Sequence, residues 1–259
     1  MAVLPNESGQ MNRACPGRGF GFYFSSQRTM QMKIARKLSV TLAASVSLLT
    51  VAQSLLAADQ VPLMLKLPAP AFKGTPKEMP PGLNVEPLSD KPRPPMMVPA
   101  GLKNIAAEPG VKITSSDKNA TADTLAKLVD GDKEASEQSI IYLRKGTQWV
   151  QMDFGSPQEI FAIALWHAHN SAKVYKSVIV QVSDDPDFIN GVKTVFNNDQ
   201  ENAAGMGVGT DRQYFETNEG KLIDAKGVKG RYIRFYSKGS TESALNEYTE
   251  IEVYGRSAK

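Results

Sequence analysis

Short runs of alternating apolar and polar residues follow one another through the chain beyond residue 101. In the run 148–154, positions 150, 152 and 154 are apolar and share one face of an extended strand, while Trp149, Gln151 and Asp153 share the other. This alternation predicts a β-strand with one face in a core. The same pattern, rich in β-branched and aromatic residues, occurs at 160–166, 177–182, 230–236 and 250–254.

Helical spacing is rare in the same region, and only 123–129 has the pattern of a short helix. Many short strands over roughly 150 residues predict one antiparallel sandwich or barrel, a size that can bury a sizeable core. The longest irregular stretch, 197–220, contains Met206 and Val208 among spaced glycines. We interpret it as a lid or loop beside a binding face and do not expect it to insert into a membrane.

The N-terminal part of the chain has a different pattern. Residues 1–31 show no clear apolar period, and we interpret them as an over-extended start outside any fold. Residues 32–58 have the order of a secretory signal peptide, with basic residues, then a long apolar run, then a pair of alanines. Cleavage near Ala58 predicts a secreted or periplasmic protein. An uncleaved membrane anchor is the alternative, although several Ser and Thr residues dilute the run.

Prolines recur every few residues between 59 and 102. Such a segment lacks backbone donors and favours extended conformations, so it cannot form a core of its own. We interpret it as a semi-rigid spacer, or as a strap lying on the domain that follows at 103–256.

Composition excludes some classes of function. Six of the 30 basic residues and one of the 27 acidic residues lie within 1–58, so the rest of the chain carries 24 basic and 26 acidic residues. This balance lacks the basic stripe of a nucleic-acid-binding protein. The sole cysteine, Cys15, also lies in this N-terminal part, so the remainder has no disulfide, no thiol nucleophile and no thiolate metal site.

Seven stretches, taken in order, resemble the coagulation-factor type C, or discoidin-like, domain. They are N-I-A-A-E-P-G-V-K-I-T-S-S (104–116), L-V-D-G-D (128–132), W-V-Q-M-D-F-G (149–155), I-F-A-I-A-L-W (160–166), V-Q-V-S-D-D-P-D-F (180–188), G-R-Y-I-R-F-Y-S (230–237) and Y-T-E-I-E-V-Y-G (248–255). The resemblance implies an all-β, antiparallel jelly-roll β-sandwich of the galactose-binding-like kind, with ligand loops at one end. Animal members usually join their ends by a disulfide, and its absence here favours the bacterial carbohydrate-binding members.

The stretch 128–132 is a candidate cation site. A glycine in the middle of a tight turn lets carbonyl oxygens and a carboxylate point at one centre, as a hard cation requires. The alternative is an ordinary turn in which Asp130 caps its own backbone. The resemblance implies a structural calcium ion closed by a glutamate of the last strand, and the implied ligands are Leu128, Asp130, Asp132, Ser136 and Glu250.

The only two histidines of the chain lie in W-H-A-H, 166–169. On an extended strand His167 and His169 share a face with apolar Leu165. Two histidines at this spacing can chelate zinc or copper, but such a site needs further ligands, which here would be carboxylates or water. A packed structural pair and a polar ligand platform are the other two interpretations.

The platform interpretation rests on sugar chemistry. A sugar ring packs its apolar face on an aromatic side chain, and its hydroxyl groups take hydrogen bonds from amide or charged groups. The candidate ligand-binding residues are Trp166, His167, His169, Asn170, Tyr175, Arg231 and Arg234. An arginine on the late strand 230–236 has a second interpretation, as the partner of a buried carboxylate.

Nothing in the sequence indicates an enzyme. The chain has no G-x-S-x-G and no H-E-x-x-H, and the acidic S-D-D-P-D at 183–187 is typical of a turn. We therefore predict an exported, non-catalytic binding module for a carbohydrate or cell-surface glycan. The alternatives are an adhesion module that binds another cell-envelope protein, and a metal-dependent enzyme that uses His167 and His169.

Overall fold

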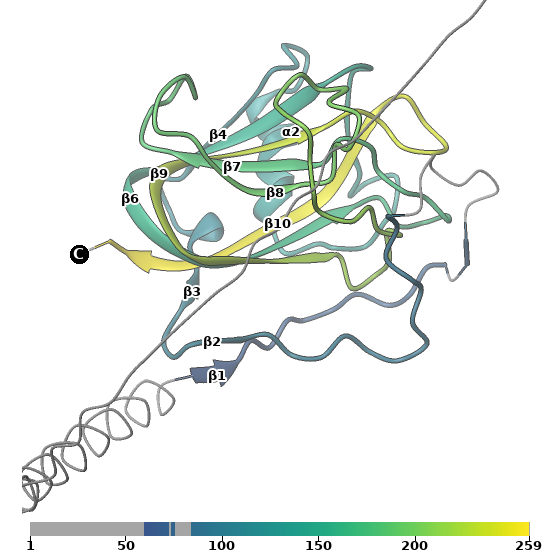
Figure 1. The fold of residues 1–259 in the computed structure, drawn as a ribbon, viewed down its shortest axis with the longest axis horizontal. Coiled ribbons are helices and arrows are strands. Elements are labelled where there is room, and N and C mark those ends of the chain that lie inside the picture. The colour runs from purple at the N-terminus through teal and green to yellow at the C-terminus, as the bar shows by residue number, and fades with distance from the viewer. Residues whose placement is uncertain (1–59, 73, 76–83, 259) are drawn as a thin grey trace, which may run out of the picture. The chain divides into compact units, whose positions relative to one another are not determined.

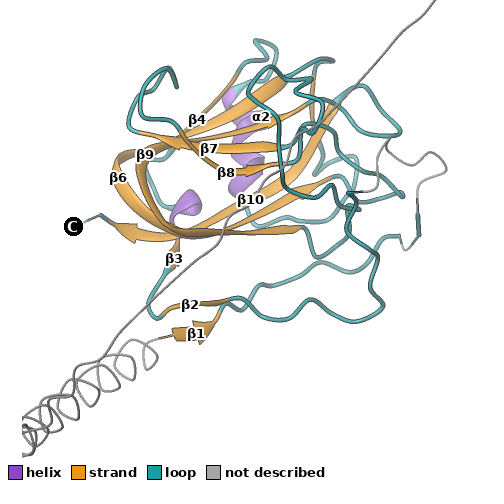
Figure 2. Cartoon of the chain, viewed as in Figure 1, coloured by secondary structure: helices purple, strands orange, loops and turns teal. Residues whose placement is uncertain are grey.

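The structure is a computed structural model that describes residues 60–72, 74–75 and 84–258. The interpretations of 1–31 as an over-extended start and of 32–58 as a signal peptide fall outside these residues. The described part of the chain is mostly antiparallel strand (Figures 1 and 2), which confirms the predicted all-β sandwich. No helix in this part is long and apolar enough to cross a membrane.

The strands of the domain are joined into one continuous sheet with the order β3-β10-β6-β9-β7-β8, to which β4 adds on β6 and β5 on β10. Their bounds are β3 Lys103–Asn104, β4 Lys112–Ser115, β5 Ile141–Leu143, β6 Gln148–His167, β7 Ile179–Ser183, β8 Lys193–Asn197, β9 Lys221–Ser237 and β10 Asn246–Ser257. The helical segments are η1 Ile105–Ala107, α2 Ala122–Ala126 and η2 Lys127–Val129.

Two strands are long enough to belong to both layers of the sandwich. β6 has 20 residues and β9 has 17, and both curve sharply at one end of the molecule (Figure 1). The sequence predicts two strands where β6 runs unbroken, because the turn-like F-G-S-P lies inside it. Gly155 adopts φ +77° there, so the chain bends without leaving the sheet.

The bends divide the sheet into two layers. Layer A consists of β4, β7, β8 and the parts 148–153 of β6 and 232–237 of β9. Layer B consists of β3, β5, β10 and the parts 158–167 of β6 and 221–228 of β9. We call the end where β6 and β9 curve the bend end. The opposite end, which carries the loops 168–178, 198–220 and 238–245, is the loop end.

The core lies between the layers and follows the predicted alternation. Val150 and Met152 of layer A are fully buried, as are Ile163 and Leu165 of layer B. Trp149 therefore lies on the outer face of layer A, as the alternation predicts. The predicted helix at 123–129 is α2 followed by η2, and the Thr121 hydroxyl caps it by accepting from the Thr124 N–H.

The described parts of the proline-rich segment lie on the domain. β1 (Gln60–Pro62) pairs with β2 (Met97–Pro99), and Val85 forms an isolated bridge with Gln213. The Arg93 guanidinium donates to the Gly220 carbonyl at 2.7 Å and to the Glu219 carbonyl at 2.9 Å. We call residues 84–95 the strap; it holds the end of the 198–220 loop against the sandwich.

Candidate functional site

The W-H-A-H motif lies inside the protein. Trp166, His167 and Tyr175 are 0% exposed and His169 is 1% exposed. None of the four side chains can receive a ligand from solvent, so the prediction that they form a sugar platform is wrong. The strand phase predicts correctly that His167 follows the core face of β6, but the phase says nothing about what covers the end of that strand.

His167 is a packed polar residue. Its ring stacks on Tyr175 with centroids 4.2 Å apart and lies 4.6 Å from the Tyr248 ring. Its Nδ1 lies 3.2 Å from Oε2 of Glu216, a residue of the 198–220 loop. His169 Nε2 lies 2.9 Å from the Lys133 carbonyl. The two histidines therefore fasten loops to the end of β6, as the structural-pair interpretation expects.

Trp166 is covered on the outer side of layer B. Its indole N–H donates to the Asn218 carbonyl at 3.0 Å, and the Lys133 ammonium lies 5.2 Å from the ring centroid. Gly220 approaches so closely that an added Cβ would lie 2.7 Å from the indole. The strap holds this glycine, so the cover on Trp166 is built by residues far away in the sequence.

A transition-metal site finds no support around the histidines. Within the part of the chain that the structure describes, no group of three or more His, Cys, Asp or Glu side chains is arranged to hold a metal ion. The chelate interpretation needed such further ligands beside His167 and His169.

The remaining candidate ligand residues lie at opposite ends of the domain. Asn170 is exposed and follows β6 at the loop end. Arg231 and Arg234 lie on β9 towards the bend end, and both are half-buried. The structure therefore does not bring Asn170 together with the two arginines.

Arg234 is the centre of a preorganised surface on the outer face of layer A. Its guanidinium lies 4.2 Å from the Trp149 ring centroid and 4.4 Å from that of Phe188. Its Nε donates to Gln151 Oε1 at 2.6 Å, and its Nη1 lies 3.4 Å from the Tyr236 hydroxyl. We call these five residues the Arg234 platform.

The register of layer A explains why these side chains meet. Gln151 pairs with Arg234, and Trp149 pairs with Tyr236 two residues along the same two strands. Paired residues point to the same face of a sheet, so all four project outward. Phe188 comes from the loop after β7, and the Pro186 carbonyl in that loop accepts from Arg234 Nη2 at 3.0 Å.

The loop that carries Phe188 is held in one conformation. The Asp185 carboxylate accepts from the backbone N–H groups of Asp187, Ile189 and Asn190, and these bonds, led by that from Asp187, lower its pKa. Phe188 adopts φ +57°, an unfavourable value for this residue type. The loop bonds hold the ring in place despite that cost.

Arg231 has a structural role beside the platform. It forms a two-point ion pair with Asp153, with N···O distances of 2.7 and 2.9 Å. The hydrogen bond from Arg231 lowers the pKa of Asp153, and burial opposes this change. The second interpretation in the sequence, that an arginine here pairs with a carboxylate, describes Arg231.

The platform offers two kinds of contact to a ligand. The half-buried Trp149 and Phe188 rings supply apolar surface, and the half-buried Arg234 guanidinium supplies hydrogen-bond donors. Gln151 and Tyr236 are buried beneath it and hold it in place. Arg234 uses three of its five N–H donors on described residues. Charges of both signs lie nearby, because Asp153 pairs with Arg231 and Asp185 is in the adjoining loop. These features favour a neutral ligand rich in hydroxyl groups.

The predicted cation loop meets the last strand. The Gly131 N–H lies 3.2 Å from both carboxylate oxygens of Glu250. Asp130 Oδ1 accepts from the Asp132 N–H at 2.8 Å, which is the turn-capping contact of the alternative interpretation. Leu128 is fully buried, and the Ser136 hydroxyl lies 2.8 Å from that of Ser139.

Glu250 is a buried carboxyl that forms no ion pair with any residue the structure describes. It is 0% exposed, and burial raises its pKa to about 8. The nearest ammonium, that of Lys133, instead forms a 2.8 Å ion pair with Glu252. A buried carboxylate beside a tight turn supplies the kind of oxygen ligand that a hard cation prefers.

Comparison with known sequences gives one family. The sequence model of the F5/8 type C domain matches residues 112–251. The comparison with curated proteins gives no match.

Several solved structures are similar at low identity. The CpGH89CBM32-6 module produced by Clostridium perfringens is 17% identical with a TM-score of 0.40, over 59% of this chain and 99% of that one. The CBM32 of AlyQ in complex with 4,5-unsaturated mannuronic acid is 17% identical with a TM-score of 0.40, over 54% and 92%. Chitosan-binding module 1 from Paenibacillus sp. IK-5 is 20% identical with a TM-score of 0.39, over 59% and 98%. This chain spans only 14% of the family 89 glycoside hydrolase from Clostridium perfringens.

The burial of both histidines predicts their chemical reactivity. Diethyl pyrocarbonate modifies imidazoles that solvent reaches, so the folded chain is expected to show no modified histidine. The unfolded chain is expected to show two. Mass spectrometry of peptides that contain 167 and 169 measures this directly. Fast modification of either histidine in the folded chain would contradict the structure.

Proposed function

Because the chain belongs to the F5/8 type C family, we propose that it is a non-catalytic binding module that holds a carbohydrate on the Arg234 platform. The observation that carries the proposal is the Arg234 guanidinium fixed between the Trp149 and Phe188 rings, at 4.2 and 4.4 Å. The sequence-based prediction centred the sugar site on W-H-A-H and also named Arg234 among the candidate ligand residues. The proposal keeps the ligand class and moves the site to a different face.

The platform suits a sugar because its parts are already in place before binding. A glycan loses affinity when side chains must be ordered around it, and here stacking and hydrogen bonds already hold Arg234. The ring edges of Trp149 and Phe188 can pack on the apolar face of a sugar. The N–H groups of Arg234 that no described residue accepts are available for its hydroxyl groups.

An envelope protein is the second candidate ligand. Aromatic residues and arginine are also the residue types most enriched in protein interfaces, so the same platform suits adhesion to a protein. The family alone does not separate the two, because function depends on the site and not on the fold.

Removing the platform is expected to remove glycan binding. Trp149→Ala and Arg234→Ala should each weaken affinity about tenfold or more, because each deletes a stacking surface or a charged donor. Arg234→Lys should also weaken it, since an ammonium lacks the planar fork. Glycan arrays find the ligand, and titration calorimetry then measures each variant.

Tyr142→Ala is the matched control, because Tyr142 is an aromatic residue of β5 at the loop end that is 42% exposed. Its affinity should stay within about twofold of the parent. Loss of binding in Tyr142→Ala with retention in Trp149→Ala would move the site to the loop end. Capture of an envelope protein through Trp149 without any glycan binding would favour adhesion.

We further propose a structural calcium ion between the 128–132 turn and Glu250. The ligands would be those predicted from the sequence: Leu128, Asp130, Asp132, Ser136 and Glu250. The buried Glu250 carboxyl beside Gly131 supports the proposal. A buried carboxylate is unfavourable without a partner of opposite charge, and a bound cation would be that partner. Such an ion would link the first loops to β10 and take the place of a disulfide.

Calcium is then expected to stabilise the fold. At roughly 100 times its dissociation constant, bound calcium should raise the melting temperature by about 5–10 °C, and a chelator should reverse this. Glu250→Gln should abolish the response, while Glu137→Gln, which changes an exposed carboxylate near the same loop, should keep it. A melting temperature indifferent to calcium and chelator would remove the proposed ion. Thermal unfolding followed by circular dichroism measures the effect.

We also propose that the chain is exported by the signal-peptide pattern at 32–58. Export predicts a product outside the cytoplasm whose N-terminus lies near Asp59, measured by the intact mass of the protein from each cell fraction. Recovery of the uncleaved chain in the membrane fraction would instead support the anchor alternative.

A further inference from the structure

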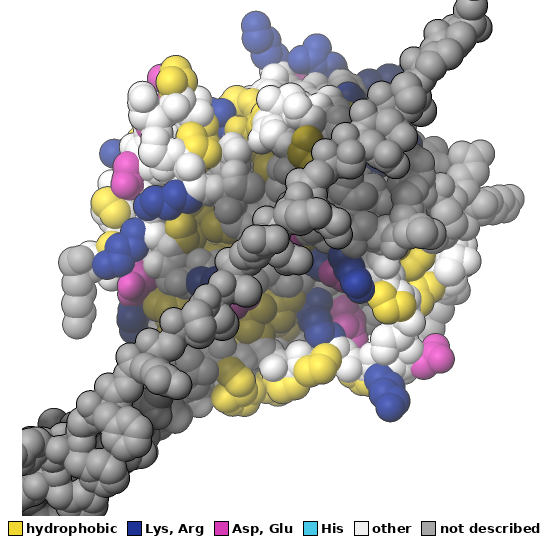
Figure 3. Space-filling model, viewed as in Figure 1, with side chains coloured by type: hydrophobic (Ala, Val, Ile, Leu, Met, Phe, Trp, Pro, Cys, Tyr) yellow, Lys and Arg dark blue, Asp and Glu magenta, His cyan; other side chains and the backbone are white. Residues whose placement is uncertain are grey.

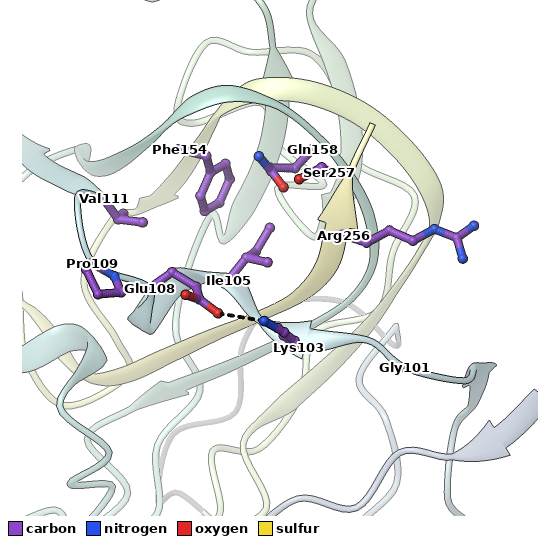
Figure 4. A pocket seen from close by; sticks show the side chains of 10 residues that line it. All are labelled: Gly101, Lys103, Ile105, Glu108, Pro109, Val111, Phe154, Gln158, Arg256 and Ser257. Atoms are coloured by element: carbon purple, nitrogen blue, oxygen red, sulfur yellow. Dashed lines mark ion pairs between the residues drawn. The ribbon is translucent and has the colours of Figure 1, made fainter. Parts of the chain in front are cut away.

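A pocket of about 360 Å³ opens at the bend end, and no residue of the Arg234 platform lines it (Figure 4). Its walls come from separate parts of the chain: β3, the segment after η1, the bend of β6 and the end of β10. Strand pairing fixes these parts, since Lys103 pairs with Gly255 and Gln158 pairs with Ser257. The pocket therefore exists before any ligand enters.

One side of the pocket is apolar. Ile105 projects into the space between Val111 and Phe154 in Figure 4. Ile105 is buried in the core, and Val111 and Phe154 pack against that core, so these side chains cannot turn away. They offer a firm surface to the apolar face of a small ring.

The other side of the pocket carries polar groups of different kinds. Gln158 is 8% exposed and its amide nitrogen donates to the Ser156 carbonyl and hydroxyl, both at 3.1 Å, which fixes its orientation. Ser257 lies beside it in Figure 4. Across the opening, the Lys103 ammonium faces the Glu108 carboxylate at 3.7 Å.

The 3.7 Å separation is longer than a hydrogen bond, so the Lys103 and Glu108 side chains form an exposed ion pair without a direct hydrogen bond. A ligand hydroxyl can bridge the pair from the side, with its oxygen about 2.8 Å from each atom, and there accept from the ammonium and donate to the carboxylate. A carboxylate or an ammonium ligand can satisfy only one of them. The remaining basic lining residue, Arg256, points away from the pocket in Figure 4 and pairs with Glu159 at 2.9 Å.

We propose that this pocket is a second binding site, which takes one neutral sugar ring or a terminal sugar of a glycan. Its volume is at the low end of the range for small-molecule sites, which suits one or two rings. Lys103 and Glu108 share one ligand hydroxyl, and Ile105, Val111 and Phe154 hold the apolar face of the ring. The site shares no residue with the platform, so it goes beyond the proposed function and is tested separately.

The test follows the methyl resonances of Ile105 and Val111 by NMR in the full chain. Glucose, galactose, mannose and N-acetylglucosamine are titrated singly, with glycerol as an open-chain polyol. At least one sugar is expected to shift both residues saturably, with a dissociation constant of about 1 mM, while glycerol does not. If no sugar moves these resonances, or if glycerol moves them equally, the proposal is overturned.

Substitutions at the rim separate this site from others. Lys103→Ala and Glu108→Gln should each weaken binding roughly fivefold to tenfold, because each removes one partner of the shared hydroxyl. Both side chains are largely exposed, so the fold should persist. Lys118→Ala, which removes an exposed lysine that does not line the pocket, is the matched control and should stay within about twofold.

Trp149→Ala tests independence from the platform and should leave the pocket unchanged. If Trp149→Ala abolishes the Ile105 and Val111 shifts, there is no second site. Unaltered sugar binding in both Lys103→Ala and Glu108→Gln would also overturn the assignment.

Discussion

The two bent strands determine most of this structure. β6 and β9 each run through both layers, and they pair with each other on both sides of the bend. A shift of the pairing by one residue in either layer would turn every side chain of that strand to the opposite face. Because each strand continues through the bend, the registers of the two layers are fixed together. The same lock places Val150 and Met152 in the core and Trp149 and Gln151 on the outer face. The platform is therefore a consequence of the pairing that builds the core.

The loop end shows a second constraint, which is the burial of polar groups. His167 with Glu216, and Lys173 with Glu247 and the Tyr175 hydroxyl, are enclosed under the loops there. Burial of charged or polar groups is unfavourable unless they are paired. One nitrogen of each histidine is paired with a loop residue, so the two histidines hold loops in place rather than form a contact surface. The other two ring nitrogens are buried without a partner among the described residues. The strap adds to this enclosure through Arg93.

Much of the fold could be predicted from the alternation of residues, and less of the site. The strand phases of 148–154 and 160–166 were correct, and the helix near 123–129 was found. The short strands β4, β5 and β8 were missed because they have few residues and mixed exposure. The strand phase also identified the face of Trp149 and Gln151. The sequence did not indicate that Phe188 belongs to the platform. Its position depends on the loop that Asp185 holds, and this loop is far from Arg234 in the sequence.

The sugar-platform interpretation of W-H-A-H failed for a physical reason, whereas the structural-pair interpretation agrees with the structure. Exposure at the end of a strand depends on loops and on the strap, which approach from residues about 50 and 75 positions away. The turn at 128–132 was different, because the resemblance named Glu250 as its partner, and the structure brings Gly131 and Glu250 together. The ion itself remains a prediction.

The chain has two tryptophans, and they separate the two candidate faces. Trp149 lies on the platform, whereas the Trp166 indole is buried and donates to Asn218. The most direct measurement is therefore a ¹H–¹⁵N spectrum of the two indole N–H groups while the protein is titrated with a glycan that it binds. The predicted result is that the Trp149 signal shifts while the Trp166 signal stays unchanged. A shift of Trp166 alone would contradict the account, because it would place the ligand at W-H-A-H.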